Sequence, residues 1–254
     1  SKSVVHKFIT FIILFIPGFY FSITLNAYLH DEFFHLQIVN RMMNSEILYR
    51  EIYTAITPLS YYITLLFIIL LGSEILVIKL INTIIFVCTV MISIDILKKI
   101  TVFNRTYTVL LIITLFAYAT PGAMGAGGIY NSLAILVFMF CFNITITWST
   151  AESGGRVIWG MKTDTILIIL GIVAGFCLLA KQNIGGLAYI SILLSIITLR
   201  YPFDSKQYLR RICYVSVPFA ITVTLALLTV WLNDAVESFW NYTVLSRFNW
   251  VETA

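Results

Sequence analysis

Polar side chains that could do chemistry interrupt an otherwise apolar chain at a few places. Asp31 and Glu32 follow the first apolar run directly, and Lys79 lies at the start of the next long one. The remaining candidates are Arg50, Glu51, Asn131, Lys181, Gln182 and Asn183. A carboxylate can take a proton from an attacking group, and a cation can stabilise a charged leaving group. Acids and amines collected at one membrane surface would therefore suit a site that handles a lipid phosphate and moves a proton.

Each of these groups also has a simpler interpretation. An acid pair after a membrane span is usually a solvated turn, and the ammonium of Lys79 can extend to the lipid headgroups. The run from Lys181 to Asn183 can be a plain polar turn. His30 and His35 flank the acids, but their spacing alone does not define a metal site. We therefore predict no metal ligands and no required cofactor, and a divalent metal stays an open alternative.

The composition places these residues in a membrane. Of the 254 residues, 60% are hydrophobic and 11% are charged, whereas a soluble domain carries roughly 25% charged residues. So few charges cannot cover the surface of a soluble protein. The chain is therefore predicted to be an all-α polytopic membrane protein, with the lipid bilayer and no nucleic acid among its partners. The cysteines lie within apolar runs and are expected to be buried: Cys88, Cys141, Cys177 and Cys213.

The apolar runs predict about seven transmembrane helices. A spanning helix needs about 20 mostly apolar residues, and the candidates are 8–28, 75–97, 106–121, 131–149, 165–180, 184–199 and 212–232. Residues 57–72 are an eighth, doubtful candidate, because the apolar core from Leu59 to Leu71 is short. An interfacial or re-entrant helix suits that core better. Residues 1–254 would then form a single transmembrane domain in which 29–73 is an outer loop with interfacial helices.

The distribution of basic residues favours this topology. With the N-terminus inside and 57–72 not crossing, all but five of the 16 Lys and Arg residues lie on the cytoplasmic side, as membrane proteins prefer. The five on the outer side are Arg41, Arg50, Lys79, Lys181 and Arg247. A rival topology, with the N-terminus outside and 57–72 crossing, gives the same balance. It joins two spans through a very short link and exports Lys2 and Lys7, so the first topology is preferred.

Taken in order, the polar motifs resemble a known family. One stretch is similar to the first outer loop of GT-C class glycosyltransferases that use polyprenyl-phosphate sugars. It consists of Asp31-Glu32, then Tyr49-Arg50-Glu51-Ile52-Tyr53, then Thr57-Pro58-Leu59-Ser60-Tyr61-Tyr62, and it ends at Gly72. Members include protein O-mannosyltransferases and lipid A aminoarabinose transferases. Lys79 matches a basic residue early in the next helix. Gly171 to Gly175, followed by Leu178-Leu179-Ala180-Lys181, matches a Gly-rich helix that ends in a Leu-x-Lys turn.

The resemblance implies an enzyme, a glycosyltransferase, in the plasma membrane of a bacterium or archaeon with its site facing outward. A polyprenyl-phosphate sugar would be the donor, and a lipid, glycan or protein would be the acceptor. Asp31 would be the general base with Glu32 beside it, and Lys181, Lys79 and Arg50 would bind the phosphate of the lipid carrier. Substrate contacts would come from Glu51, Asn131, Gln182, Asn183 and Tyr61. Family chains usually continue with further spans, so the resemblance implies either a fragment that holds the catalytic half or an unusually small member.

Two other classes of protein fit the same composition. A transporter or flippase for a lipid-linked or neutral solute would also be this hydrophobic and could use the outer polar cluster. It would yield no new covalent product. A non-catalytic membrane subunit would tolerate Asp31→Asn but would depend on its lipid-facing helix surfaces for association.

Overall fold

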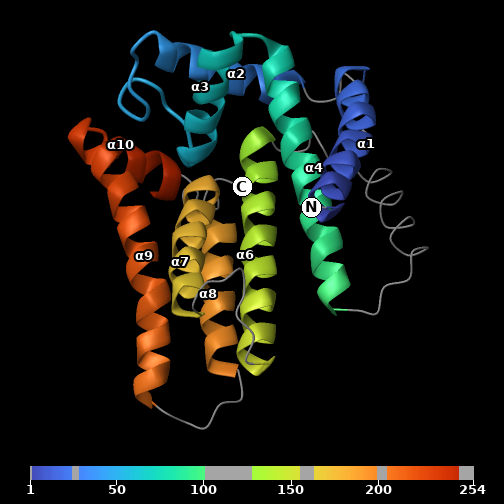
Figure 1. Cartoon of the computed structure of the whole chain (residues 1–254). Helices are drawn as coiled ribbons and strands as arrows, with labels where there is room; N and C mark the ends of the chain where they lie inside the picture. Colours follow the sequence, from blue (N-terminus) through green and yellow to red (C-terminus); the bar gives the residue numbers. More distant parts are fainter. Residues whose placement is uncertain (1, 25–28, 101–127, 155–162, 199–204, 246–254) are drawn as a thin grey trace, which may run out of the picture. The chain divides into compact units, whose positions relative to one another are not determined.

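The computed structural model of the chain describes residues 2–24, 29–100, 128–154, 163–198 and 205–245. These residues form helices and no strand (Figure 1). In chain order the elements are α1 (Lys2–Thr24), α2 (Leu29–Met43), α3 (Leu59–Leu71), α4 (Ile75–Ile100), α6 (Gly128–Gly154), α7 (Thr163–Ala180), α8 (Gln182–Thr198), α9 (Ser205–Leu232), α10 (Val236–Trp240) and the short π-helix η1 (Asn241–Leu245).

Five of the described helices are long and apolar enough to cross a membrane. Their apolar stretches are Lys7–Thr24, Ile75–Lys99, Ile129–Ser149, Thr163–Ala180 and Ser205–Leu232. The prediction of an all-α membrane protein is thereby confirmed. The predicted span 184–199 corresponds to α8, which has 17 residues and is slightly shorter than the others. The predicted span 106–121 lies outside the described residues, so the number of seven spans remains a prediction.

The chain folds as two compact units, which are described separately. Unit 1 comprises residues 1–44 and 60–136 and contains α1 to α4 and the start of α6. Helix α1 lies along α4 (Figure 1), and Leu14 of α1 packs against Val87 and Val90 of α4. Helix α2 buries the face that carries Glu32, His35 and Leu36, because residues three or four apart share one side of a helix.

Helix α3 occupies the predicted apolar core, from Leu59 to Leu71. It has 13 residues, which is too short to cross a bilayer core of about 30 Å unless the bilayer thins. Gly72 ends it with a φ of 99°, a left-handed conformation that glycine adopts without strain. The Gly72 N–H donates to the Ile68 carbonyl at 2.9 Å, which satisfies one of the last carbonyls of the helix.

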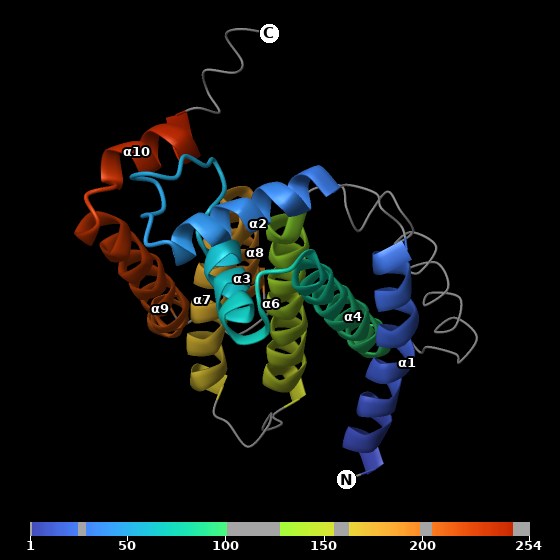
Figure 2. The same cartoon turned by 90° about the horizontal axis from the view of Figure 1, so that it is seen from above.

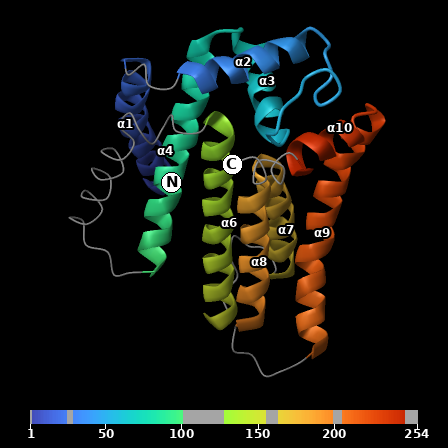
Figure 3. The same cartoon turned by 180° about the vertical axis from the view of Figure 1, so that it is seen from behind.

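Unit 2 comprises residues 45–59 and 137–254 and contains most of α6 with α7 to η1. Helices α7 and α8 lie side by side (Figure 3), and α6, α7, α8 and α9 share one apolar core. A Cβ atom added to Gly171 of α7 would lie 2.2 Å from the carbonyl oxygen of Val215 in α9. Gly175 of α7 approaches Thr222 of α9 similarly. Small residues four apart on α7 thus let the two membrane helices pack closely, with a backbone contact at Gly171.

The segment from Ser45 to Pro58 packs on the C-terminal helices of unit 2 (Figure 2). Tyr49 meets Phe239 of α10 edge to face, with ring centroids 4.9 Å apart. Tyr53 meets Tyr242 of η1 at 5.0 Å. Aromatic contacts of this kind stabilise a loop beyond the area they bury.

The expectation that all cysteines are buried is only partly right. Cys141 and Cys177 are buried and Cys88 is half-buried, whereas Cys213 is exposed. It lies on α9, one side of which carries exposed apolar residues such as Val217, Ile221 and Leu225. In a membrane helix such a side can face lipid, so an apolar position in the sequence does not imply burial within the chain.

Candidate functional site

The predicted site residues are divided between the two units. Unit 1 holds Asp31, Glu32, Tyr61, Lys79 and Asn131, and unit 2 holds Arg50, Glu51, Lys181, Gln182 and Asn183. In unit 1, Glu32 and Lys79 lie in direct contact. Tyr61 is buried beside His35, and Asn131 is half-buried in the first turn of α6. Among the predicted site residues, direct polar contacts are thus made by Glu32 with Lys79 in unit 1 and by Arg50 with Glu51 in unit 2.

Asp31 and Glu32 face different sides of α2. Both lie in the first turn, where the positive end of the helix dipole favours acids, and Arg41 in the last turn suits the negative end. Successive residues of a helix are about 100° apart around its axis. Asp31 is consequently exposed, while Glu32 is only 8% exposed. The two neighbouring carboxylates thus have different environments, and only one lies inside the protein.

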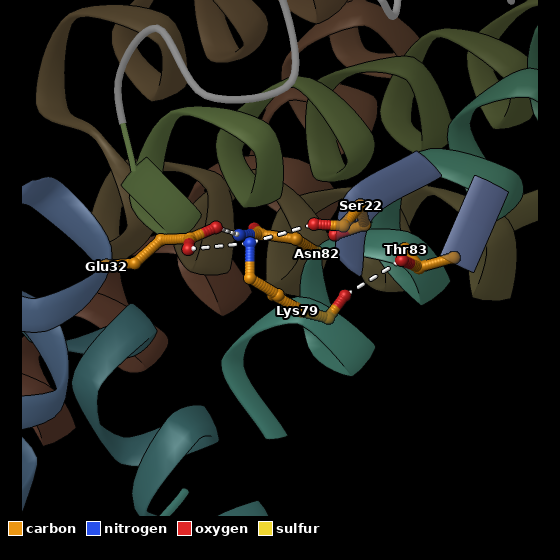
Figure 4. A network of polar contacts seen from close by, with 5 residues as sticks. All are labelled: Ser22, Glu32, Lys79, Asn82 and Thr83. Atoms are coloured by element: carbon orange, nitrogen blue, oxygen red, sulfur yellow. Dashed lines mark hydrogen bonds and ion pairs between the residues drawn. The ribbon is translucent and has the colours of Figure 1, made fainter. Parts of the chain in front are cut away.

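Glu32 pairs with Lys79 of α4 inside unit 1 (Figure 4). The Lys79 ammonium lies 3.3 Å from Oε2 of Glu32, and the Lys79 residue is 5% exposed. Lys79 also donates to the backbone carbonyl of Ser22 in α1 at 2.8 Å. The cluster therefore ties α1, α2 and α4 together. The ammonium predicted to meet a lipid phosphate is partly neutralised by this carboxylate.

Asn82 belongs to the same cluster, and sequence reasoning missed it. Its amide Nδ2 donates to Oε1 of Glu32 at 3.5 Å, at the long limit of a hydrogen bond. Asn82 follows Lys79 by three residues on α4, so the two lie on one helix face. That spacing was readable from the sequence as a polar pair on an apolar helix.

Two buried acceptor atoms in this cluster have no hydrogen-bond donor. They are Oε2 of Glu32 and Oδ1 of Asn82. The Lys79 ammonium attracts Oε2 as an ion-pair partner but is not placed for a hydrogen bond to it. Buried polar atoms are almost always satisfied, so these two acceptors are unusual among the described residues.

Burial raises the pKa of Glu32 above its ordinary value of 4.5. The charge and close approach of Lys79, together with the hydrogen bond from Asn82, act in the opposite direction, but desolvation is the larger effect. A carboxylate with a raised pKa is a stronger base than one in water. Glu32 is therefore suited to accept a hydrogen bond or a proton from a hydroxyl group.

His35 lies on the buried face of α2, one turn after Glu32, and is only 2% exposed. Its ring stacks on Tyr61 at 4.5 Å, and its Nε2 lies 3.0 Å from the Thr64 hydroxyl. Thr64 gives its own hydroxyl proton to the Ser60 carbonyl at 2.8 Å, so Nε2 of His35 is the donor. Burial lowers the pKa of His35 to about 4, and the ring is neutral at pH 7.

No group of three metal-binding side chains occurs among the residues that the structure describes. His35 uses its ring in the contacts with Thr64 and Tyr61. The side chain of His30, the other histidine that flanks the acids, lies outside the described residues.

In unit 2, Arg50 and Glu51 form an ion pair at the surface. Their closest atoms are 2.8 Å apart, and both side chains are exposed. The other carboxylate oxygen of Glu51 accepts the Ile47 backbone N–H at 2.6 Å and so closes the turn. Exposed pairs contribute little stability, typically about 0–1 kcal/mol. The guanidinium of Arg50 is therefore accessible to an anion at small cost.

Lys181 is the single residue between α7 and α8, and Gln182 and Asn183 are the first two residues of α8. Gly185 makes the link possible, because an added Cβ would lie 2.2 Å from the Leu178 backbone. Gln182 donates to the Thr243 carbonyl of η1 at 3.2 Å. Its amide thus has a structural contact in addition to any role in binding substrate. Lys181 is half-buried and Asn183 is exposed.

The fold and these clusters define an α-helical membrane protein with a buried acid–base network at one end of a candidate span. Neither a family model, nor a curated protein, nor a solved structure matches the chain. The function is therefore inferred from the residues themselves.

Proposed function

We propose that the chain is a glycosyltransferase that moves a sugar from a polyprenyl-phosphate donor to a hydroxyl or amine acceptor, with inversion, at the outer membrane face. The observation that carries the proposal is the Glu32 network. It combines a buried carboxylate of raised pKa, a lysine partner and two acceptor atoms without donors. The order of motifs that resembles the GT-C class supports the same function.

The residues of unit 1 suit separate parts of this reaction. The acceptor attacks the anomeric carbon, the bond from that carbon to the phosphate oxygen breaks, and the phosphate leaves with the electron pair. Asp31, exposed in the first turn of α2, takes the acceptor's proton. Oε2 of Glu32 and Oδ1 of Asn82 accept hydrogen bonds from sugar hydroxyls. Lys79 keeps Glu32 charged and positioned. The roles of Lys181 and Arg50 toward the phosphate remain predictions.

The test is donor turnover by the full chain in vesicles made from the lipids of its own source organism. Mass spectrometry would follow the conversion of polyprenyl-phosphate sugars to polyprenyl phosphate. Asp31→Asn should lose about 10²–10⁴-fold in rate, the usual contribution of a general base. Asp95→Asn is the matched control, because it also removes one carboxylate, from an exposed pair with Lys99 at 3.1 Å. Full turnover by Asp31→Asn would remove Asp31 from the mechanism.

Transport is the second candidate, and the same ion pair favours it. Ionisable residues near membrane spans often mark the path of an ion or solute. A transporter would move its solute across a vesicle without making polyprenyl phosphate or a new glycoside. The turnover assay therefore separates the two functions.

A further inference from the structure

A polar pocket in unit 2 is not used by the proposed sugar transfer. Its volume is about 100 Å³, and its walls come from the last turns of α6 and the first turns of α7 and α9. By the same measure a water molecule needs only about 10–15 Å³. The polar side chains in the walls are Trp148, Thr163, Asp164, Gln207, Arg210 and Arg211.

The charges in the walls favour an anion. Asp164 is bound by Arg210, with 2.5 Å between the closest atoms, and both side chains are substantially exposed. Arg211 adds a second guanidinium, so two cations and one anion line the pocket. Arg211 is only 6% exposed, and its guanidinium carbon lies 5.9 Å from the centre of the Trp148 ring. The described part of α7 begins at the pocket with Thr163, and the start of a helix favours negative charge.

Trp148 forms the part of the pocket wall that lies beside Arg211. The residue is 1% exposed, and its indole Nε1 has no hydrogen-bond partner. An indole nitrogen can only donate, so it needs an acceptor. Buried donors are almost always paired, so this one is unusual. An anion in the pocket would accept from the guanidinium of Arg211, and its arrival would change the surroundings of the neighbouring Trp148 ring.

We propose that this pocket binds a phosphate group, carried by a membrane lipid headgroup or as free phosphate. Planar guanidinium groups bind phosphate oxygens through paired hydrogen bonds. The pocket lies at the end of α7 and α9 that the distribution of basic residues assigns to the cytoplasmic side. The inference rests on the pocket alone and holds whether or not the chain transfers a sugar.

The experiment labels all five tryptophans of the full chain with 5-fluorotryptophan and follows their ¹⁹F resonances in a phosphate-free detergent. Trp148→Phe, which keeps an apolar ring, identifies the Trp148 signal by its loss. One arm titrates inorganic phosphate, and the other titrates phosphatidylglycerol. A saturable shift of the Trp148 signal in either arm supports the proposal, and the arm that responds at lower concentration names the source of the phosphate.

Two charge-removing variants on α9 separate specific binding from general attraction. Arg211→Gln should raise the half-saturating concentration about tenfold or more, as expected for the loss of a charged hydrogen bond. Lys206→Gln removes the same charge from an exposed side chain outside the pocket walls and should leave binding unchanged. If Arg211→Gln does not fold, the wild-type titration and Lys206→Gln still decide. No saturable shift in either arm, or an equal loss in Lys206→Gln, would overturn the proposal.

Discussion

The close contact between α7 and α9 gives a prediction whose size can be worked from atomic distances. In Gly171→Ala the new Cβ would lie 2.2 Å from the Val215 carbonyl oxygen, whereas ordinary contacts begin at 3.4 Å. The obstacle is backbone, so no side-chain rotation relieves it, and the two helices must separate by about 1 Å. Overpacking of this kind typically costs about 1–3 kcal/mol. We expect a loss of stability at the upper end of that range.

Alanine substitutions at two further glycines should be progressively less destabilising. In Gly175→Ala the Cβ would lie 2.7 Å from Cβ of Thr222, so relief needs a smaller shift against a side chain. In Gly186→Ala nothing lies within 4 Å of the new Cβ. A helical alanine there should be neutral or should stabilise by up to about 1 kcal/mol. The order of stability should be Gly186→Ala, then Gly175→Ala, then Gly171→Ala.

The assay is equilibrium unfolding of the purified chain in mixed micelles, with a non-ionic detergent titrated against a denaturing one. Each variant is compared with wild type at a fixed ratio of lipid to detergent. Gly171→Ala and Gly186→Ala make the same chemical change in neighbouring helices, so their difference isolates the packing. Equal stability of these two variants would refute the backbone contact between α7 and α9.

Two further predictions concern the buried groups of unit 1. Because burial lowers the pKa of His35 to about 4, His35 binds a proton in the unfolded chain but not in the folded one between about pH 4 and its ordinary value of 6.5. The free energy of unfolding should therefore fall as the pH drops below 6.5, by up to about 3 kcal/mol near pH 4. Unfolding of His35→Gln, measured across this pH range, should lack this part of the pH dependence. The same pH dependence in His35→Gln as in wild type would contradict the prediction. Lys79→Met leaves Glu32 buried without its cation and should destabilise by about 3–5 kcal/mol in the same assay, whereas Glu32→Gln added to Lys79→Met should recover most of the loss. If the double variant is no more stable than Lys79→Met, the ion pair is not the reason for the destabilisation.

Local signals in the sequence predicted much of the fold. The limits of α3 follow from where the apolar run begins and from Gly72, both of which act within a few residues. The helices themselves follow from long apolar runs, since the bilayer leaves the backbone few other choices. The two units could not be predicted in this way, because they depend on which helix faces meet.

The candidate site, like the fold, could be predicted only where it depends on local sequence. The sequence marked Glu32 and Lys79 as chemically capable, but it did not predict that they pair, because the pairing depends on α2 meeting α4. Gly171 and Gly175 were read as part of a family motif, and the structure shows them as a helix-packing surface. Arg211 was predicted only as a cytoplasmic charge. In the fold it is buried and lies beside Trp148, which is 63 positions earlier in the printed sequence.

The most direct test of the central claim is donor turnover by the double variant Glu32→Gln/Lys79→Met. This variant removes the catalytic network without leaving an unpaired buried charge, so it should fold like wild type. We expect wild type to convert polyprenyl-phosphate sugars to polyprenyl phosphate, and we expect the folded double variant not to do so. Turnover at the wild-type rate by the double variant, or none by wild type, would contradict this expectation.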